Sequence, residues 1–482
     1  MPTLFTVANR LPVTITDEGV KRSSGGLVAA LEGLPQGRYD LRWIGWPGGE
    51  IAEERKEDVR RQLGEQGTTP VFLTADEAAG HYEGFSNASL WPLLHNMTTR
   101  FRYEPGWWDV YQAVNRRFAD AVLAEAEDGD LVWVHDYQLM LLPRMIKEAR
   151  PELRVGFFLH TPFPSYETFR CHPQREAIIA GVVGADLIGF HTFGYLRHFR
   201  SAVLRLLGIE SEITKIRHDG RTSTLGVYPI GINGPKFDAA LDAPAFEEKK
   251  RQFADVHRGK RLVLSVERLD YTKGLLERLD AIDAFLSTYD GRDKMRFVFV
   301  SVPSRENVAE YRELIEAVES KVGRINGRHT TLHNTPVHFI HGSVQFDELV
   351  ALYALAEVCL VTPLIDGMNL VAKEYAACQR EGRAEPGVLV LSEFAGAAEE
   401  LFSAIVVNPY DTRQLSLALR AALDMPAGER RERMAPMRQR VMTWDAGAWA
   451  RQFVDDLAKP PARPATGSGA ADPAEAREPS HT

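Results

Sequence analysis

Seven short apolar runs recur along this chain and alternate with amphipathic segments. Every run is four or five residues long and rich in β-branched and aromatic side chains. Continuous runs of this kind, separated by helices, are typical of parallel sheets that helices cover on both faces. We therefore predict an α/β fold with parallel sheets. The runs are 131–134, 155–159, 262–266, 297–300, 337–340, 358–361 and 388–391.

The chain has 482 residues. This length exceeds the size at which a domain with a single hydrophobic core stops growing, so we expect two domains. Turn-forming residues occupy 228–235 near the middle, and a charged helix is expected to follow through 249–251. This pattern predicts a domain boundary, with residues 1–233 in one domain and 234–443 in the other.

The end of the chain divides into two parts. Trp449, Phe453 and Leu457 recur at helical spacing, which predicts a helix with one apolar face over 444–458. Residues 459–482 are rich in Pro, Ala, Gly and Ser and hold almost no large apolar side chains. Such a segment buries too little surface to offset its ordering entropy, so we expect a disordered tail.

Composition argues against several classes of function. The net charge is −9 with both signs scattered along the chain, which disfavours nucleic acid or anionic membrane as a partner. The three cysteines form no CxxC pair, so disulfides and cysteine metal sites are not expected. No secretory signal and no apolar run of about 18 residues occurs. We expect a cytoplasmic protein that acts on small molecules.

Polar side chains follow the predicted strands at their carboxyl ends. Asp136, His160 and Arg305 each come shortly after one of the runs, and Arg268 and Lys273 follow another. In open α/β sheets, ligands bind outside the carboxyl ends of the strands. Loops are generally polar, but complementary chemistry on several strands predicts a common site.

The segment 362–375 is the most informative of these strand ends. It predicts a strand turning into a helix, with Gly367 where backbone can approach a ligand and helix amides that favour a phosphate. The carboxylates of Asp366 and Glu374 would be repelled by phosphate, so they should accept hydrogen bonds from sugar hydroxyls. This combination indicates a nucleotide-sugar. The alternative is an ordinary turn, with Asp366 capping the helix and Glu374 solvated beside Lys373.

Arg268 and Lys273 are the predicted partners of a diphosphate. A helix terminus contributes only about 0.3–1 kcal/mol to anion binding, whereas each charge-assisted hydrogen bond contributes about 1.5–3 kcal/mol. Arg offers a planar fork and Lys a point charge for the phosphate oxygens. The alternative is a solvated loop that happens to carry two cations.

The amino-terminal half predicts a second anion site. Arg10 follows a first strand, and Gly25 and Gly26 stand where a helix should begin. Tyr82 and Trp91 lie in a segment with poor helical periodicity and offer aromatic faces with polar edges, which suit a sugar. Each aromatic residue could equally be part of the core.

These residues lie in motifs that resemble the trehalose-6-phosphate synthases, which are glycosyltransferases of the GT-B fold. The motifs occur in the family's order from near residue 5 to near residue 455, and only the tail falls outside. They are Asn9–Pro12, Ser24–Leu27, Phe85–Asn87, Leu90–Pro92, Trp133–Tyr137, Phe158–Pro164, Tyr228–Ile232, Ser265–Gly274 and Asp366–Val371.

The resemblance implies two Rossmann-like domains with parallel sheets that face each other across a cleft. It also implies retaining transfer of glucose from a nucleoside-diphosphate glucose to glucose-6-phosphate, giving trehalose-6-phosphate without a cofactor. UDP-glucose is the first candidate donor. ADP- and GDP-glucose stay open because Ile365 and His191 depart from residues common in the family.

The family's roles carry over by motif. Five residues would lie at the reacting centre, namely Asp136, His160, Arg268, Lys273 and Asp366. The acceptor phosphate would be held by Arg10, Tyr82, Trp91 and Arg305. The donor would be held by Gly25, Gly26, Arg268, Lys273, Asp366, Gly367, Met368, Asn369, Leu370 and Glu374. The DxD sequence at 128–130 is read as a solvated turn, so no metal ligand is expected.

Three other functions stay in view. One is a related transferase with another phosphorylated acceptor such as glycerol-3-phosphate, and another is a catalytically silent regulatory homologue. The third is a pyridoxal-dependent phosphorylase of the same architecture. No DxDxT phosphatase motif occurs, so a separate phosphatase would act downstream. The oligomeric state, including a homo-oligomer, stays open.

Overall fold

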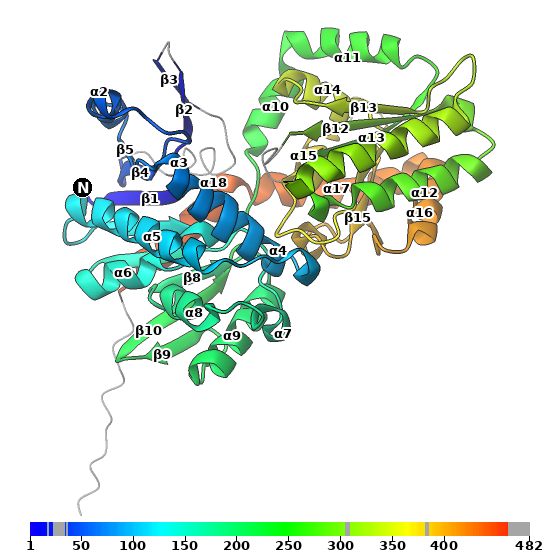
Figure 1. Ribbon diagram of the computed structural model, residues 1–482. Helices are drawn as coiled ribbons and strands as arrows, with labels where there is room; N and C mark the ends of the chain where they lie inside the picture. Colours follow the sequence, from blue (N-terminus) through cyan, green and yellow to red (C-terminus); the bar gives the residue numbers. More distant parts are fainter. Residues whose placement is uncertain (17–18, 23–33, 35–36, 304–308, 381–384, 461–482) are drawn as a thin grey trace, which may run out of the picture.

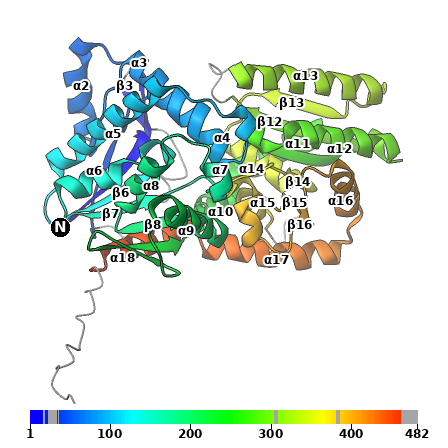
Figure 2. The ribbon, with the colours of Figure 1, turned by 60° about the horizontal axis from the view of Figure 1, so that its bottom comes forward.

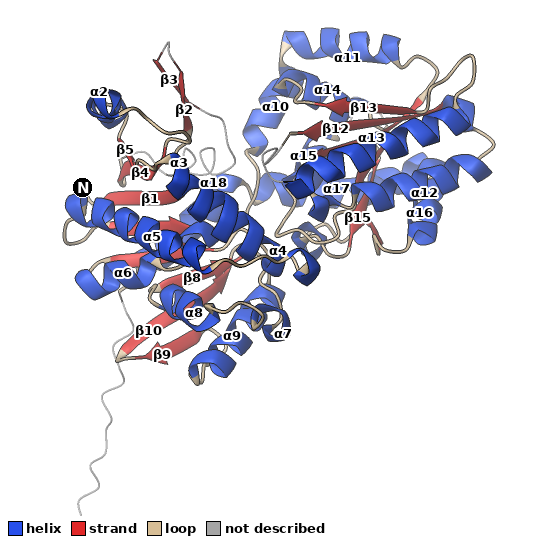
Figure 3. Ribbon diagram, viewed as in Figure 1, coloured by secondary structure: helices blue, strands red, loops and turns tan. Residues whose placement is uncertain are grey.

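Two parallel sheets organise the protein into two α/β domains, as the sequence predicts (Figure 1). Helices lie on both faces of each sheet (Figure 3). The predicted strands are confirmed, because each of the seven apolar runs coincides with a strand to within about two residues. The computed structural model describes residues 1–16, 19–22, 34, 37–303, 309–380 and 385–460.

The amino-terminal domain is built on an eight-stranded sheet with the order β5-β4-β1-β6-β7-β8-β10-β9. All neighbouring strands are parallel except β9 and β10. The strands are β1 (Thr3–Arg10), β4 (Asp40–Trp46), β5 (Thr68–Pro70), β6 (Leu131–His135), β7 (Arg154–Phe158), β8 (Leu187–Phe190), β9 (Lys215–His218) and β10 (Arg221–Val227), with a separate hairpin of β2 (Val13–Thr16) and β3 (Gly19–Arg22).

The helices of this domain range from α5, with 21 residues, to several of only three or four residues. They are α2 (Glu53–Gly64), α3 (Ala75–Ala78), η1 (Ala79–Leu90), α4 (Trp91–Leu94), η2 (Thr98–Arg100), α5 (Pro105–Glu125), η3 (Tyr137–Leu139), α6 (Leu142–Ala149), α7 (Tyr166–Phe169), α8 (Arg175–Val183) and α9 (Phe193–Leu207).

The carboxyl-terminal domain is built on a six-stranded sheet with the order β13-β12-β11-β14-β15-β16, and all of its strands are parallel. Its strands are β11 (Arg261–Arg268), β12 (Met295–Val302), β13 (Val337–His341), β14 (Val358–Val361), β15 (Val388–Ser392) and β16 (Ile405–Val407). Its helices are α10 (Gly234–Asp242), α11 (Pro244–Val256), η4 (Tyr271–Lys273), α12 (Leu275–Thr288), η5 (Arg292–Lys294), α13 (Ala309–His329), α14 (Phe346–Leu355), α15 (Leu370–Cys378), η6 (Gly396–Glu399), α16 (Thr412–Asp424) and α17 (Ala427–Thr443).

The last helix, α18 (Ala446–Ala458), leaves the carboxyl-terminal domain and packs on the amino-terminal one. It contacts β7 and β8, and the ring of Phe453 stacks on that of Trp133 with 4.5 Å between centroids. Figure 2 shows α17 along one domain and α18 along the other. Trp449 and Leu457 share the buried face of α18 with Phe453. The residues beyond 460 lie outside the described part of the chain.

The two chain segments that cross between the domains lie side by side. The indole nitrogen of Trp444, after α17, donates a hydrogen bond of 2.7 Å to the carbonyl of Pro229. Trp449 likewise donates to the carbonyl of Tyr228, at 3.1 Å. The predicted boundary segment between β10 and α10 is therefore tied directly to the start of α18.

The segment with poor helical periodicity is a π-helix, η1, which carries Tyr82. The hydrogen bonds of a π-helix span five residues, so its side chains recur at a wider spacing than 3.6 and the α-helical pattern fails. The π-helix ends where α4 begins at Trp91. No helix in the described ranges is long and apolar enough to cross a membrane.

Candidate active site

A cleft of about 620 Å³ lies between the two domains, at the carboxyl ends of the strands. Residues from both domains line it, as an open α/β arrangement leads one to expect. They are Ala8, Asn9, Arg10, Tyr82, His135, Asp136, Gln138, His160, His191, Ile230, Val266, Glu267, Arg268, Lys273, Asp366, Met368, Asn369, Leu370 and Val371.

Most of the predicted site residues meet at this cleft. Ten of them line it, namely Arg10, Tyr82, Asp136, His160, Arg268, Lys273, Asp366, Met368, Asn369 and Leu370. Trp91, Gly367 and Glu374 lie outside its lining. Gly25, Gly26 and Arg305 lie outside the described residues. The cleft also holds His135, Gln138 and Glu267, which sequence reasoning did not single out although each stands within or beside a family motif.

Lys273 and Asp366 form a buried ion pair on the carboxyl-terminal wall. The Nζ of Lys273 lies 2.5 Å from Oδ2 of Asp366, and only 10% and 15% of the two side chains are exposed. Burial alone would raise the pKa of Asp366, but the charge and hydrogen bond of Lys273 more than offset it and hold this pKa below its usual value. Asn369 donates a further hydrogen bond of 3.0 Å to the same oxygen. The carboxylate is thus ionised and oriented toward the cleft.

Arg268 completes this wall at the end of β11. Its side chain is exposed and lines the cleft, and no hydrogen bond or ion pair to it occurs among the described residues. An arginine fork that the protein leaves available in a cleft is suited to a phosphate or diphosphate.

Gly367 brings the two domains into contact. A Cβ atom at this position would lie 2.1 Å from the carbonyl oxygen of His160, so any side chain would collide with the opposite domain. The hydroxyl of Tyr195, on α9, donates to the carbonyl of Asp366 at 3.0 Å. The tight turn predicted from the sequence therefore permits a close approach of the His160 backbone, and the loop around Asp366 is held against the amino-terminal domain.

Three histidines form the floor of the cleft. His135 and His160 share a hydrogen bond of 3.1 Å between Nδ1 and Nε2. Burial lowers the pKa of His160 to about 4 and those of His135 and His191 well below the usual value. All three rings are therefore neutral near pH 7 and act as hydrogen-bonding groups rather than as cations. The backbone amide of His160 also donates to Oδ1 of Asp136 at 3.2 Å.

The amino-terminal wall carries a cation among aromatic rings. The guanidinium of Arg10 lies 4.9 Å from the ring centroid of Trp46 and donates to the carbonyl of Gly48 at 3.2 Å. Tyr82 meets the same indole edge-on, with 5.9 Å between centroids. Partial burial lowers the pKa of Arg10 from its usual value, but an arginine keeps its charge at any physiological pH.

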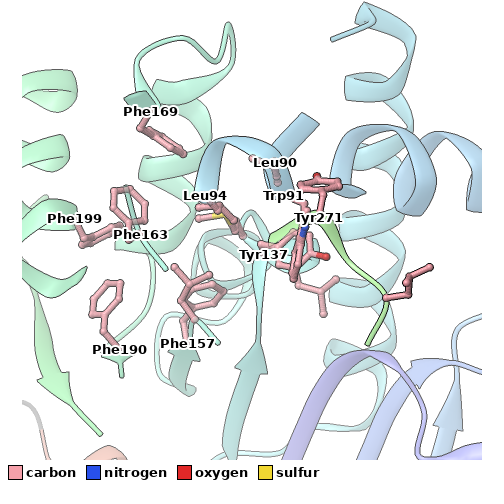
Figure 4. Close-up of a cluster of buried hydrophobic side chains, with 14 of the residues drawn as sticks. Leu90, Trp91, Leu94, Tyr137, Phe157, Phe163, Phe169, Phe190, Phe199 and Tyr271 are labelled. Atoms are coloured by element: carbon pink, nitrogen blue, oxygen red, sulfur yellow. The ribbon is translucent and has the colours of Figure 1, made fainter. Parts of the chain in front are cut away.

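Trp91 belongs to the same hydrophobic core as Trp46. It is 5% exposed, and its ring packs on those of His95 and Tyr137. Figure 4 shows it among buried apolar side chains, with Tyr271 of the carboxyl-terminal domain nearby. Its burial agrees with the alternative interpretation of the sequence, in which this aromatic residue is part of the hydrophobic core.

Glu374 and Lys373 are both engaged by the protein, contrary to the alternative of solvated side chains. Glu374 accepts a hydrogen bond of 2.8 Å from the hydroxyl of Tyr353, and burial raises its pKa. Lys373 is 2% exposed, is paired with Glu400 and donates to the carbonyl of Ile230 at 2.7 Å. Lys373 thereby joins α15 to the segment between β10 and α10.

The DxD sequence has a structural explanation. Asp130 accepts hydrogen bonds from the backbone amides of Thr3, at 2.7 Å, and Glu127, at 2.9 Å, while Asp128 pairs with Arg150. Asp130 is buried rather than solvated, because it ties this turn to the start of β1. Within the described ranges, no group of three or more His, Cys, Asp or Glu side chains is arranged to hold a metal ion.

Comparison with known proteins identifies the family of this chain. Residues 2–459 match the profile of glycosyltransferase family 20. The chain belongs to this family. Among curated proteins, it is 42% identical to the UDP-forming alpha,alpha-trehalose-phosphate synthase 2 of Aspergillus niger, over 95% of this chain and 97% of that one.

Solved structures of this family share the fold. One from E. coli, bound with UDP-2-fluoro glucose, has a TM-score of 0.86 and 33% identity, and covers 95% of this chain and 99% of its own. A UDP-forming alpha,alpha-trehalose-phosphate synthase from Burkholderia xenovorans, in complex with glucose-6-phosphate, has a TM-score of 0.85 and 33% identity, covering 94% and 99%. The GT-B arrangement expected from the sequence is confirmed.

Proposed function

We propose that this chain transfers glucose from UDP-glucose to glucose-6-phosphate and releases trehalose-6-phosphate and UDP. One observation carries the proposal: the cleft presents cationic side chains on opposite walls. Arg268 and Lys273 stand on the carboxyl-terminal wall and Arg10 on the amino-terminal wall. Two phosphorylated substrates that must meet without their phosphates touching require such a separation of positive charge.

The carboxyl-terminal wall is the proposed donor site. Arg268 and Lys273 would bind the diphosphate, and Asp366 would accept hydrogen bonds from the hydroxyls of the glucose. Its neighbours Gly367, Met368, Asn369 and Leu370 would offer backbone amides. Glu374 would hold the ribose, and Gly25 and Gly26 would cover the diphosphate from the opposite domain. His160 would contact the donor sugar as a neutral hydrogen-bonding group, consistent with its lowered pKa.

The amino-terminal wall is the proposed acceptor site. Arg10 and Tyr82 would bind the phosphate of glucose-6-phosphate, with Arg305 reaching it from the other domain. Trp91 would support this site from the hydrophobic core that it shares with Trp46. Asp136 would orient the acceptor hydroxyls. A separate phosphatase would act on the product, and the cytoplasm is the proposed compartment.

The transfer would occur with retention on one face of the donor sugar. Among the described residues, three carboxylates line the cleft, and each is engaged by the protein: Asp366 by Lys273, Glu267 by Arg278 and Asp136 by the amide of His160. A double-displacement reaction needs a carboxylate placed to attack the anomeric carbon. Because the three carboxylates are held by these protein groups, we assign none of them as the nucleophile. The main catalytic contribution is then the stabilisation of the departing UDP by Arg268 and Lys273. A phosphate oxygen of the UDP takes the proton of the acceptor hydroxyl.

Product analysis tests the proposed function. We expect the protein, incubated with glucose-6-phosphate and UDP-glucose, to form α,α-linked trehalose-6-phosphate and UDP in equal amounts, with proton NMR reporting the anomeric configuration. Parallel reactions replace the donor by ADP- or GDP-glucose and the acceptor by glycerol-3-phosphate. Transfer to glycerol-3-phosphate alone, or no product with any donor, would contradict the proposal, and an inverted linkage would contradict retention.

The acceptor site predicts an effect confined to one substrate. Replacing Arg10 by alanine should raise the KM for glucose-6-phosphate by about tenfold or more, because one charge-assisted contact to the phosphate contributes about 1.5–3 kcal/mol. The dissociation constant of UDP, measured by calorimetry, should stay unchanged. Arg42→Ala, at an exposed arginine of the neighbouring strand β4, is the matched control. Equal weakening of both ligands in Arg10→Ala would refute this assignment.

A further inference from the structure

A fully buried arginine lies directly behind the donor wall. Arg278, in the first turns of α12, is 1% exposed and does not line the cleft. An arginine is rarely buried to this degree, because removing its charge from water costs several kcal/mol unless its donors are satisfied. Its environment must therefore supply an opposite charge and several hydrogen-bond acceptors.

Arg278 finds acceptors in three neighbouring segments. Its Nε donates to the hydroxyl of Thr362 at 2.8 Å, and its Nη2 donates to the carbonyl of Lys273, also at 2.8 Å. Its Nη1 donates to Ser265 and to the carboxylate of Glu267. The Glu267 side chain is 5% exposed and supplies the opposite charge. Each of the three guanidinium nitrogens thus donates at least one hydrogen bond.

Those three segments are the ones that carry the donor wall. Ser265 and Glu267 belong to the end of β11, which leads to Arg268, and Lys273 ends the next turn. Thr362 follows β14 and begins the loop that leads to Asp366. The two loops also share a backbone hydrogen bond of 2.8 Å from Leu364 to Thr272. Arg278 is therefore a common anchor for the cations and for the carboxylate of the donor wall.

We propose that Arg278 is a positioning residue that holds the Arg268–Lys273 turn and the Asp366 loop in register for the nucleotide-sugar. This role rests on the proposed function, because it concerns the donor site. A planar fork with fixed directions can set the distance between two loops, whereas a single ammonium group cannot. Arg278 touches neither substrate, so its effect on turnover is transmitted through the position of Lys273 and Asp366.

The same sheet supplies a matched control. Arg261, at the amino end of β11, also joins β11 to the residue before β14, through hydrogen bonds of 3.1 and 2.9 Å to Glu357. It lies at the opposite end of the strand and is absent from the cleft lining. Loss of either arginine should weaken the sheet, but only loss of Arg278 should disturb the donor wall.

The experiment compares Arg278→Met, Arg278→Lys and Arg261→Met with the unmodified protein. We expect Arg278→Met to lower kcat with UDP-glucose by about 10²-fold, because a misplacement of about 1 Å in a reacting group has that effect. Arg278→Lys keeps the charge opposite Glu267 and hence the fold, yet it should still lose about tenfold in kcat because it cannot replace the fork. In both variants the KM for glucose-6-phosphate should stay within about twofold.

Two further measurements separate positioning from general stability. Unfolding by denaturant should show a loss of stability in both Arg261→Met and Arg278→Lys, but kcat should be retained in Arg261→Met and lowered in Arg278→Lys. Calorimetry should show weaker UDP binding in the Arg278 variants alone. If Arg278→Lys turns over normally, or if Arg261→Met loses as much activity, the positioning role is refuted. Failure of the unmodified protein to form trehalose-6-phosphate would instead reject the proposed function on which this role rests.

Discussion

Alanine in place of Arg268 is expected to lower turnover by about 10²–10³-fold, the usual scale for removing one preorganised group that stabilises developing charge. The guanidinium stands at the end of β11 in the cleft wall, where negative charge would grow on the phosphate oxygen of the departing UDP. Because the described residues offer it no ion pair, no protein group loses its partner in the variant. The melting temperature should therefore hardly change.

The control is Arg413→Ala, which removes an exposed arginine from α16 in the same domain. This variant alters the net charge by the same amount and should keep full activity. Turnover and both KM values are measured in the same assay of UDP release. Near-normal turnover in Arg268→Ala would refute the assignment of this side chain to the donor diphosphate.

Much of the fold could be predicted because buried parallel strands leave a continuous apolar run. The strands that escaped prediction lack that signature. β10 (Arg221–Val227) is polar at several positions and pairs with a short antiparallel strand. β8 (Leu187–Phe190) is only four residues long and holds Gly189, whose missing side chain makes room for the rings of Phe158 on the neighbouring strand and Phe453 of α18. Both rings approach through tertiary packing, which no local pattern reveals.

The site could be predicted only in part, for a related reason. Strand order brings the carboxyl ends together, so Asp136, His160 and Arg268 could be placed in one site from their positions after apolar runs. The hydrogen-bond partners that hold these site residues in place could not be predicted in this way, because they are distant in the sequence. Arg278 is satisfied by Thr362, 84 residues later, and Lys373 by Ile230, 143 residues earlier. On a helix, both would be expected on the solvated face from composition alone.

The second large effect is expected at the buried ion pair of Lys273 and Asp366, where one variant should lose both stability and turnover and a second should regain stability alone. Lys273→Ala leaves the ionised Asp366 buried without its partner, which should cost about 3–5 kcal/mol of unfolding free energy. Turnover should fall by about 10²–10³-fold, because the variant also loses a cation from the proposed diphosphate site. The double variant Lys273→Ala/Asp366→Asn removes the unpaired charge and should regain most of the stability while staying inactive.

The pH dependence of these variants follows from the direction of the pKa shift. In the unmodified protein the pKa of Asp366 is lowered in the fold, so its stabilising contribution is present at neutral pH and is lost as pH falls through that pKa. In Lys273→Ala, burial acts without the offsetting cation and raises this pKa, so the variant's deficit in stability should shrink from pH 7 toward about pH 4. Denaturant unfolding at several pH values measures the deficit. A deficit independent of pH would show that the charge of Asp366 is not what Lys273 balances. Recovery of activity in the double variant would instead show that Lys273 is not needed at the diphosphate.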